Sequence, residues 1–273
     1  MSIDSLRGRL TAIADAIRAK TGRPDKMTLD DMPLEIGMIQ SGGGDDGSLK
    51  GIIERTATEV TLPSDLTKIG DYAFYQYKTL TKVSLPSGVT SIGDYAFYYN
   101  SQLTDMHLPS DVTSIGKSAL YFCKNLEITS LPSNLEVIGD SAFRDCTNLK
   151  LTSLPPKLRS VSDNAFYNCT NLAITSVPSS WYTFNSYTFC NCTGLTHITI
   201  PRVDQMNHYV FQNCTGLNSV TIGRGPNNKS MSQYAFRGCT NLHTINVSWA
   251  EGEISGAPWG ATNATIHYNY TGG

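Results

Sequence analysis

The sequence predicts a repeat solenoid of eight stacked coils of about 23 residues, whose strands form a parallel β-sheet. A short helical segment is expected to precede the solenoid at the N-terminus. Two regular columns of residues predict the solenoid. In the first, prolines recur every 23 residues, each directly after Leu, Val or Ile. These are Pro63, Pro86, Pro109, Pro132, Pro155, Pro178 and Pro201. One unit of this size cannot bury its own apolar face, so successive units must share a core.

The second column is a large apolar anchor, followed six positions later by a leucine. The anchors are Phe74, Phe97, Leu120, Phe143, Phe166, Phe189, Phe211 and Phe236. The leucines are Leu80, Leu103, Leu126, Leu149, Leu172, Leu195, Leu217 and Leu242. The consensus is L-P-x-x-[LV]-x-x-I-G-x-x-A-F-x-x-C-x-x-L-x-x-[VI]-x. We therefore assign residues 49–248 to the solenoid.

Local patterns assign structure within each repeat. The stretch LTKVSLP from Leu80 alternates apolar and polar residues, which predicts a short strand ended by a proline that cannot donate to a sheet. The stretch DYAF from Asp71 predicts a turn of tight helix or a bend that sends Ala and Phe inward. Successive strands are expected to pair in parallel.

The phrases LPSGVTSIGDYAFYYNSQLTD and LPSNLEVIGDSAFRDCTNLK resemble the BspA-like leucine-rich repeats of bacterial surface proteins, over roughly 190 of the 273 residues. The resemblance implies an α+β leucine-rich-repeat fold, curved or twisted into a right-handed solenoid. It also implies a role in adhesion and protein recognition. The periodicity by itself predicts only the solenoid.

Residues 1–40 do not repeat and are expected to be helical, for attachment or oligomerisation. Apolar residues at alternating spacings of three and four form a heptad-like seam: Ile3, Leu6, Leu10, Ile13 and Ile17. Such a short helix is marginal alone. Either it folds back on a second helix near Thr28, or it joins copies of the chain into a homo-oligomer. Residues 41–48 are predicted to be a Gly/Asp linker, and 249–273 a C-terminal cap.

The segments LTAIADAIRAKTGRPDKMTLDDMPLEI and SWAEGEISGAPWGATNATIHYNYTGG are similar to the termini of bacteriophage tail or tail-fibre proteins of gut Firmicutes. This resemblance implies that the helical end attaches to a virion and that the solenoid faces the host. It also implies release by lysis, which requires no export signal.

Charge and motifs exclude several classes of function. The net charge of −2 and pI of about 6.2 offer no basic field, so we expect neither nucleic acid nor membrane as a partner. The start MSIDSLRGRL does not resemble a signal peptide, which predicts synthesis in the bacterial cytoplasm. The five histidines occupy different phases of the repeat, and common catalytic motifs are missing from the sequence. We predict a protein that is not an enzyme and needs no cofactor.

Six cysteines stand three residues after the anchors: Cys123, Cys146, Cys169, Cys192, Cys214 and Cys239. Free cysteine is among the most buried residue types, so this column predicts buried thiols. A metal site would need ligands that converge on one point, whereas a column spreads them along the axis. Cys190 stands outside the column and forms only a weak pair with Cys192.

Two tyrosine columns occupy variable positions and suit recognition of proteins or sugars. The first tyrosine column, two residues before the anchor, comprises Tyr72, Tyr95, Tyr187, Tyr209 and Tyr234. The second tyrosine column, one residue after it, comprises Tyr75, Tyr98, Tyr121 and Tyr167. Arg144 shares the second phase. We expect the second column to be the more exposed and the first to be either exposed or half-buried between coils.

The three middle repeats place an apolar residue two positions after the leucine rather than three, at Ile128, Leu151 and Ile174. If the strand phase is kept, these side chains form an apolar row on the open sheet face and a candidate contact patch. If the backbone bulges by one residue, they turn inward and Thr129, Thr152 and Thr175 face outward. The pattern favours the bulge.

The expected function is therefore non-enzymatic binding of a bacterial surface protein or glycan, by a tail-associated receptor-binding component of a phage or prophage. The rival is a cell-surface or secreted BspA-like adhesin. An enzyme acting on glycans, or a structural spacer, ranks below both. Candidate ligand contacts are Tyr75, Tyr98, Tyr121, Tyr167, Arg144, Ile128, Leu151 and Ile174.

Overall fold

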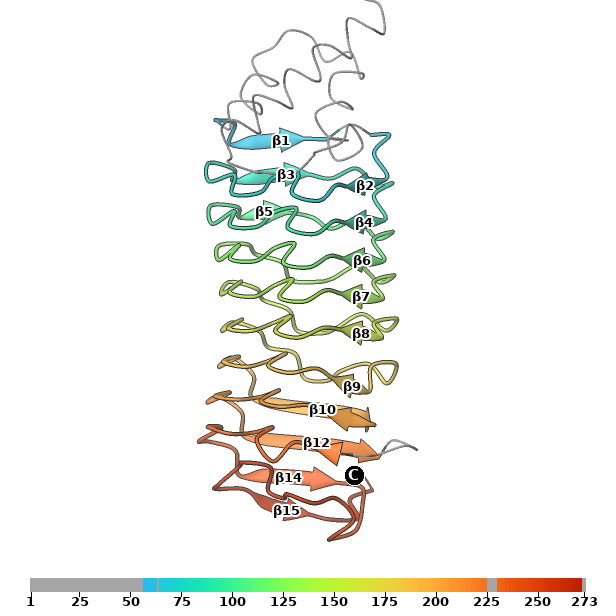
Figure 1. Cartoon of the computed structure of the whole chain (residues 1–273), viewed down its shortest axis with the longest axis vertical. Helices are drawn as coiled ribbons and strands as arrows, with labels where there is room; N and C mark the ends of the chain where they lie inside the picture. Colours follow the sequence, from blue (N-terminus) through green and yellow to red (C-terminus); the bar gives the residue numbers. More distant parts are fainter. Residues whose placement is uncertain (1–55, 63, 225–229, 272–273) are drawn as a thin grey trace, which may run out of the picture.

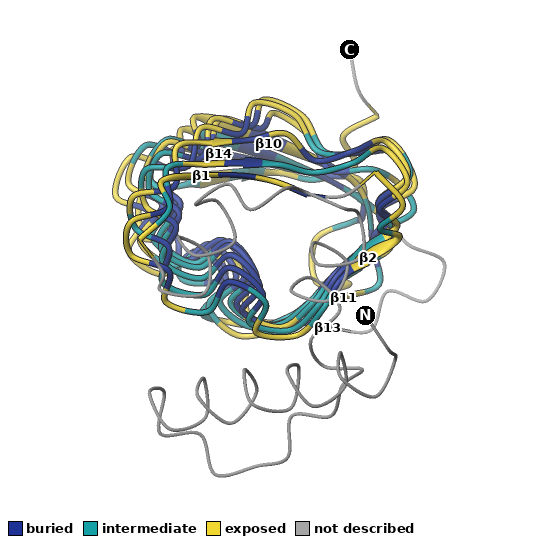
Figure 2. Cartoon of the chain, turned by 90° about the horizontal axis from the view of Figure 1, so that it is seen from above, coloured by how far each residue is buried: buried dark blue, intermediate teal, exposed yellow. Residues whose placement is uncertain are grey.

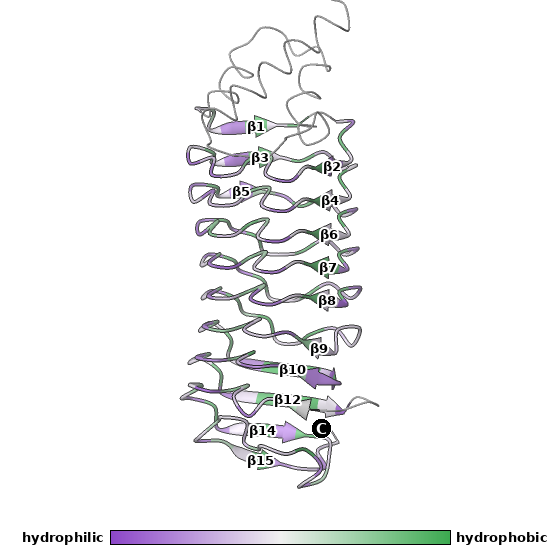
Figure 3. Ribbon diagram, viewed as in Figure 1, coloured by the Kyte–Doolittle hydropathy of each residue, from purple (hydrophilic) through white to green (hydrophobic). Residues whose placement is uncertain are grey.

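The computed structural model describes residues 56–62, 64–224 and 230–271, which form a solenoid of about nine turns (Figure 1). Strands occupy two sides of the coil and tight turns form the third, except that the stretches containing Ile128, Leu151 and Ile174 in the middle coils form no strand. Buried residues recur at equivalent places around the stacked coils (Figure 2). Hydrophobic residues recur at equivalent places along the stacked coils (Figure 3). The predicted repeat architecture with parallel strands is confirmed.

The first strand side holds two parallel sheets, in which each strand pairs with its equivalent in a neighbouring coil. The N-terminal sheet comprises β1 (Glu59–Thr61), β3 (Lys82–Ser84) and β5 (Asp105–Met106). The C-terminal sheet comprises β10 (His197–Val203), β12 (Ser219–Arg224), β14 (Thr244–Val247) and β15 (Thr265–His267). Alternate residues point inward, as Ile198 and Ile200 do in β10, because side chains alternate across a strand.

The second strand side is built from two-residue strands in two further parallel sheets. The first of these sheets contains β2 (Lys68–Ile69), β4 (Ser91–Ile92), β6 (Ser114–Ile115), β7 (Val137–Ile138) and β8 (Ser160–Val161). The second contains β9 (Thr183–Phe184), β11 (Gln205–Met206) and β13 (Ser230–Met231). In the first sheet the second residue of each strand is buried, which places one aliphatic side chain per coil in the core.

The remaining side of the coil is built from tight turns. Within the described ranges there is no helix, so the helical component of the predicted α+β class is wrong for the repeats. The physical reason is the backbone around the anchor. Residues two before and two after it adopt positive φ in most coils, as Tyr95 (55°) and Tyr99 (61°) do around Phe97, and this interrupts a right-handed helix.

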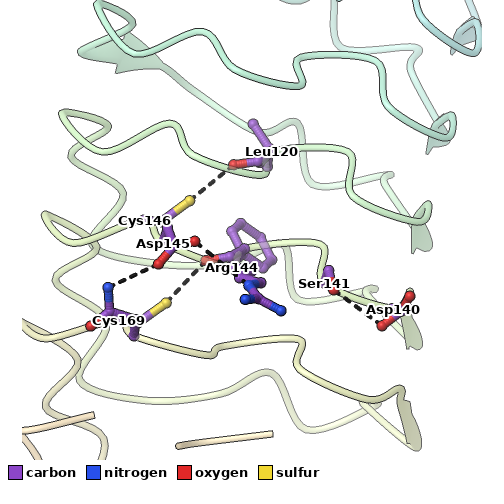
Figure 4. A network of polar contacts seen from close by, with 9 residues as sticks. Leu120, Asp140, Ser141, Arg144, Asp145, Cys146 and Cys169 are labelled. Atoms are coloured by element: carbon purple, nitrogen blue, oxygen red, sulfur yellow. Dashed lines mark hydrogen bonds and ion pairs between the residues drawn. The ribbon is translucent and has the colours of Figure 1, made fainter. Parts of the chain in front are cut away.

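Anchors and thiols form continuous columns through the core. The rings of Phe143, Phe166 and Phe189 stack with centroids 5.4 and 5.6 Å apart. All six column cysteines are buried free thiols, as expected, and each thiol donates a hydrogen bond to an anchor carbonyl of the preceding coil. The bond from Cys146 Sγ to the Leu120 oxygen is 3.0 Å long (Figure 4). Between each pair of adjacent coils that it joins, the thiol column therefore provides a hydrogen bond to one buried backbone carbonyl.

The middle coils adjust their backbone and bury the unusual aliphatic row. Exposed fractions are 5% for Ile128, 0% for Leu151 and 1% for Ile174. Thr129, Thr152 and Thr175 are exposed in their place. The bulged alternative is thus the one observed, because three stacked aliphatic side chains gain more from the core than from water. As a consequence, Ile128, Leu151 and Ile174 are wrong as ligand contacts.

The C-terminal segment adds a coil, and the expected count of eight is corrected to about nine turns. In β15, Ile266 pairs with Ile245 of β14. Trp249 and Trp259 are buried at 1% and 0% exposure, with ring centroids 6.0 Å apart. The segment expected as a cap thus continues the sheet and places two large apolar side chains against the last repeat.

The predictions for residues 1–40 and 41–48, including the seam from Ile3 to Ile17, lie outside the described residues. Within the ranges that the structure describes, no helix has the length and apolar character needed to span a membrane.

Candidate recognition surface

The second tyrosine column forms a stacked ladder on the turn side of the solenoid. Tyr75 and Tyr98 stack with ring centroids 5.0 Å apart and an interplanar angle of 5°. Tyr98 and Tyr121 stack at 4.8 Å and 18°. The rings superpose because equivalent residues of adjacent coils are separated by about one inter-strand spacing, roughly 4.8 Å, which is close to ring-stacking distance.

Arg144 continues this column where the tyrosines are interrupted. Its Cζ lies 4.4 Å from the ring centroid of Tyr167 and 5.8 Å from that of Tyr121. Its Nε lies 3.6 Å from Oδ2 of Asp145 (Figure 4). The other carboxylate oxygen, Oδ1, accepts a 2.8 Å hydrogen bond from the side-chain amide of Asn168. A guanidinium over an aromatic face is attracted by the ring quadrupole. We call the continuous row Tyr75, Tyr98, Tyr121, Arg144 and Tyr167 the ladder.

Further aromatic residues flank the ladder at its N-terminal end. Tyr72 and Tyr95 of the first tyrosine column stack at 4.9 Å. On the other flank, Tyr99 and Phe122 stack at 4.4 Å, and Tyr99 also lies 5.9 Å from Tyr121. Aromatic side chains of three successive coils therefore form one surface.

A second aromatic group lies near the C-terminal end of the first tyrosine column. Tyr187 and Tyr209 stack at 5.0 Å, and Tyr209 and Tyr234 at 5.3 Å. His208 lies beside this stack and makes a 2.8 Å hydrogen-bonding contact with Ser232. The intervening positions of the column are Ser118, Ser141 and Asn164.

The expected difference in exposure between the two tyrosine columns is wrong. The ladder tyrosines are all half-buried, and the most exposed member of either column is Tyr72, at 40%. The cause is the stacking itself, because each ring in the interior of a column covers the faces of its neighbours. What remains accessible is chiefly the ring edges.

Burial also changes the acidity of the central phenols. Partial burial raises the pKa of Tyr98, and the neighbouring phenols add to the effect. Burial likewise raises the pKa of Tyr121, although the positive charge of Arg144 acts in the opposite direction. Both pKa values start from 10.0, so these hydroxyls stay protonated at neutral pH and can donate hydrogen bonds.

Sequence reasoning located the ladder but missed Tyr99 and Phe122, which share one repeat phase directly after Tyr98 and Tyr121. The signal was present in the consecutive phrases AFYYN and ALYFC, each with two adjacent aromatic residues. Also missed was the row of aspartates before the turn. Asp71 and Asp94 each accept a 2.7 Å hydrogen bond from a backbone N–H of the next coil.

Cys190 is the one cysteine outside the thiol column. It is buried, at 3% exposure, and its Sγ lies 3.8 Å from the amide oxygen of Gln212. Burial raises its pKa to about 11, which disfavours the reactive thiolate. No group of three or more potential metal ligands occurs in the part of the chain that the structure describes.

Comparison with solved structures supports this architecture. A leucine-rich repeat protein of T. pallidum is 30% identical to this chain, with a TM-score of 0.55, covering 59% of this chain and 78% of that one. A leucine-rich repeat protein from Bacteroides ovatus is 24% identical, with a TM-score of 0.53. That match covers 78% of this chain and 61% of the other. Curated proteins yielded no match.

The stacked coils and continuous side-chain columns define a leucine-rich-repeat solenoid, a class that generally serves as a non-enzymatic binding scaffold. Residues 54–173 and 159–256 match the model of the BspA type leucine rich repeat region, in six copies. The chain belongs to this BspA-type family.

Proposed function

We propose that this protein is a non-enzymatic receptor-binding component that recognises a bacterial surface protein or glycan through the ladder. The observation that carries the proposal is the stacked row from Tyr75 to Tyr167 with Arg144 in it. Tyrosine and arginine are enriched in recognition surfaces because they offer large contact area and several polar contacts.

The fold itself does not require these tyrosines. Other coils place Gln212 and Arg237 at the ladder position and Ser118, Ser141 and Asn164 at the position of the first tyrosine column. The same backbone therefore forms with smaller or more polar side chains. This internal comparison supports a role for the aromatic residues beyond folding.

For the biological setting, we propose a tail-associated component of a phage or prophage. The support is the similarity of residues 10–36 and 248–273 to phage tail proteins, and not the solenoid. The alternative is a cell-surface or secreted adhesin, which membership of the BspA-type family favours. A gene located among tail and lysis genes would support the first setting, whereas an upstream in-frame signal sequence would support the second.

The proposed recognition is tested by capture experiments with the full chain on a glycan array and on surface extracts from a panel of bacteria. The test variant carries Tyr75→Gln, Tyr98→Gln and Tyr121→Gln, with Gln212 as the structural precedent. The matched control carries Tyr182→Gln and Tyr270→Gln, at exposed positions away from the ladder. We expect the test variant to lose capture and the control to retain it. Equal capture by both would refute the role of the ladder.

A further inference from the structure

The geometry of the ladder limits how a ligand can contact it. Tyr98 lies between Tyr75 and Tyr121 at 5.0 and 4.8 Å, so both of its faces are covered. Tyr121 is covered by Tyr98 on one side, and the guanidinium of Arg144 lies on the other. A ligand therefore meets hydroxyl-bearing edges. Partners that stack flat on aromatic rings, such as bases of single-stranded nucleic acid, require open faces.

The polar groups at the edge of the ladder are mainly hydrogen-bond donors. Burial raises the pKa of Tyr98 and of Tyr121, so both phenols stay protonated at neutral pH, and a hydrogen bond to Asp145 also contributes to the raised pKa of Tyr121. Arg144 adds a guanidinium, which carries only donors. Because these groups stack on one another coil by coil, they form a row that follows the stack of coils drawn in Figure 1. Such a row is complementary to an extended chain of acceptors.

Charge is distributed unevenly around this side of the coil. We define the turn strip as the ladder residue and the four residues after it in each coil. Its segments are 75–79, 98–102, 121–125, 144–148, 167–171, 190–194, 212–216 and 237–241. Within the strip, the cationic side chains are Lys78, Lys124, Arg144 and Arg237, and Asp145 is the only carboxylate. The whole chain, by contrast, has a net charge of −2.

Acidic residues lie on the opposite flank of the ladder, three residues before the anchors. They are Asp71, Asp94, Asp140 and Asp163. Three of these carboxylates are held by backbone N–H groups of the next coil, at 2.7 Å each. Lys117 occupies the same position in the coil of Leu120 and lies 4.0 Å from Asp140. This flank therefore holds four carboxylates and one cation, whereas the strip holds four cations and one carboxylate.

Arg144 is held in place within the ladder, between Tyr121 and Tyr167. Tyr167 supports its guanidinium at 4.4 Å, and Asp145 approaches its Nε at 3.6 Å. The side chain is still 34% exposed. An arginine that is positioned before binding loses less entropy when it pairs with a carboxylate or phosphate.

We propose that the turn strip binds a linear acidic glycan whose chain runs along the solenoid axis, with Arg144 as the central contact to its carboxylate or phosphate groups. This inference rests on the proposed function and names the class of ligand. The phenol edges would donate to hydroxyl or ring oxygens of successive units, and Lys78 and Lys124 would add charge along the same line.

The test is affinity electrophoresis of the full chain in native gels at low ionic strength. The four probes are polygalacturonate, de-acylated poly(glycerol phosphate), neutral dextran and single-stranded dT20. We expect retardation by polygalacturonate or poly(glycerol phosphate), and the stronger of the two identifies the anionic group. Added salt should weaken it, because exposed charges are screened. Retardation by neither polymer, or equal retardation by dT20, would overturn the proposal.

Arg144→Gln is the decisive variant, because Gln212 already occupies the same position and the fold accommodates it. Loss of a charge-assisted bidentate contact should weaken binding about ten-fold. Arg159→Gln removes an equally cationic side chain, which directly precedes β8 on the second strand side and pairs with Glu136, and should leave binding unchanged. Circular dichroism of both variants confirms folding. Equal affinities of the two variants would refute Arg144 as the contact.

This experiment is independent of the capture test. If the ladder variant loses capture of a neutral glycan or a protein while no acidic polymer retards the chain, the proposed function stands and the acidic-glycan inference fails. If acidic polymers bind through Arg144 while capture from bacterial extracts is unaffected by the ladder variant, the polyanion site exists and the proposed function fails.

Discussion

Tyr72, Tyr95, Tyr99 and Phe122 adopt positive φ angles between 55° and 61°. This left-handed region costs an L-residue roughly 1–2 kcal/mol, and asparagine tolerates it better than a bulky aromatic. Asn168 and Asn213 occupy the position of Tyr99 in later coils, with φ of 57° each. The aromatic residues therefore replace side chains that fit the backbone more easily, and stacking offsets the cost.

The opposing terms predict a small effect for Tyr99→Asn. Relief of about 1 kcal/mol of backbone strain should offset the loss of about 0.5–1.5 kcal/mol of ring stacking. We expect the free energy of unfolding in urea to change by less than about 1 kcal/mol. Phe97→Ala, which removes the fully buried anchor two residues earlier in the same coil, should cost about 3–5 kcal/mol. A similar loss for both variants would contradict this balance.

The thiol column predicts a loss of stability at alkaline pH. Burial raises the pKa of Cys123 from 9.0 to about 12, so the folded chain keeps this proton after the unfolded chain has released it. The contribution of this protonated thiol to the free energy of unfolding is therefore fully present below pH 9 and is lost as the pH rises toward 12. Urea unfolding from pH 7 to 10.5 should show a falling midpoint above pH 9, with a shallower fall in Cys123→Ala. Identical slopes in the two proteins would contradict the assignment.

At the level of elements, glycines set how closely the coils approach. Gly93, Gly116 and Gly139 stand in the same position of consecutive coils. A Cβ on Gly116 would lie 2.5 Å from Asp94 Oδ1 and 2.7 Å from the Asp94 backbone nitrogen. That Asp94 carboxylate accepts the Lys117 N–H, so the glycine also protects the bond that joins the two coils.

Gly116→Ala should therefore destabilise the protein by about 1–3 kcal/mol through overpacking. Gly88→Ala is the matched control, because a Cβ there meets its nearest atom at an ordinary 3.5 Å. Thermal unfolding followed by circular dichroism compares the two. We expect a lower midpoint for Gly116→Ala alone, and a decrease of equal size in both variants would contradict the close-contact explanation.

The sequence was sufficient to predict the period, the inward columns and the buried thiols, because these follow from spacing that the stacked coils preserve. It left the row at Ile128, Leu151 and Ile174 open, since a one-residue bulge depends on the energy of the assembled core. It left the turn segment open between a tight helical turn and a bend, because a DYAF-type phrase does not reveal that the residues two before and two after the anchor adopt positive φ. The sequence also did not reveal that the tyrosine faces are covered, because their stacking depends on the distance between coils in the folded chain.

On the scale of the whole molecule, stability in a solenoid is the sum of coil and interface terms, so its ends need protection. Trp259 is fully buried, and its carbonyl accepts a 2.9 Å hydrogen bond from the backbone of Phe236. Trp249 packs edge to face with it. The last coil thus closes the apolar end of the repeats with the largest side chains in the chain.

Trp259→Ala should cost about 3–5 kcal/mol and act first on the C-terminal coils. Hydrogen exchange should show faster exchange in β14 and β15 than in β4 and β6. Exchange that accelerates equally along all described coils would instead indicate a single cooperative unit, and would contradict a local role of this end.

The most direct test of the recognition surface is hydroxyl-radical footprinting of tyrosines with and without bound bacterial surface material. The ladder predicts protection of Tyr98 and Tyr121 on binding. Tyr182 and Tyr270, exposed at 39% and 38% away from the ladder, should be modified at an unchanged rate and serve as internal controls. Protection of Tyr182 or Tyr270 with no change at Tyr98 and Tyr121 would place recognition elsewhere and contradict the account.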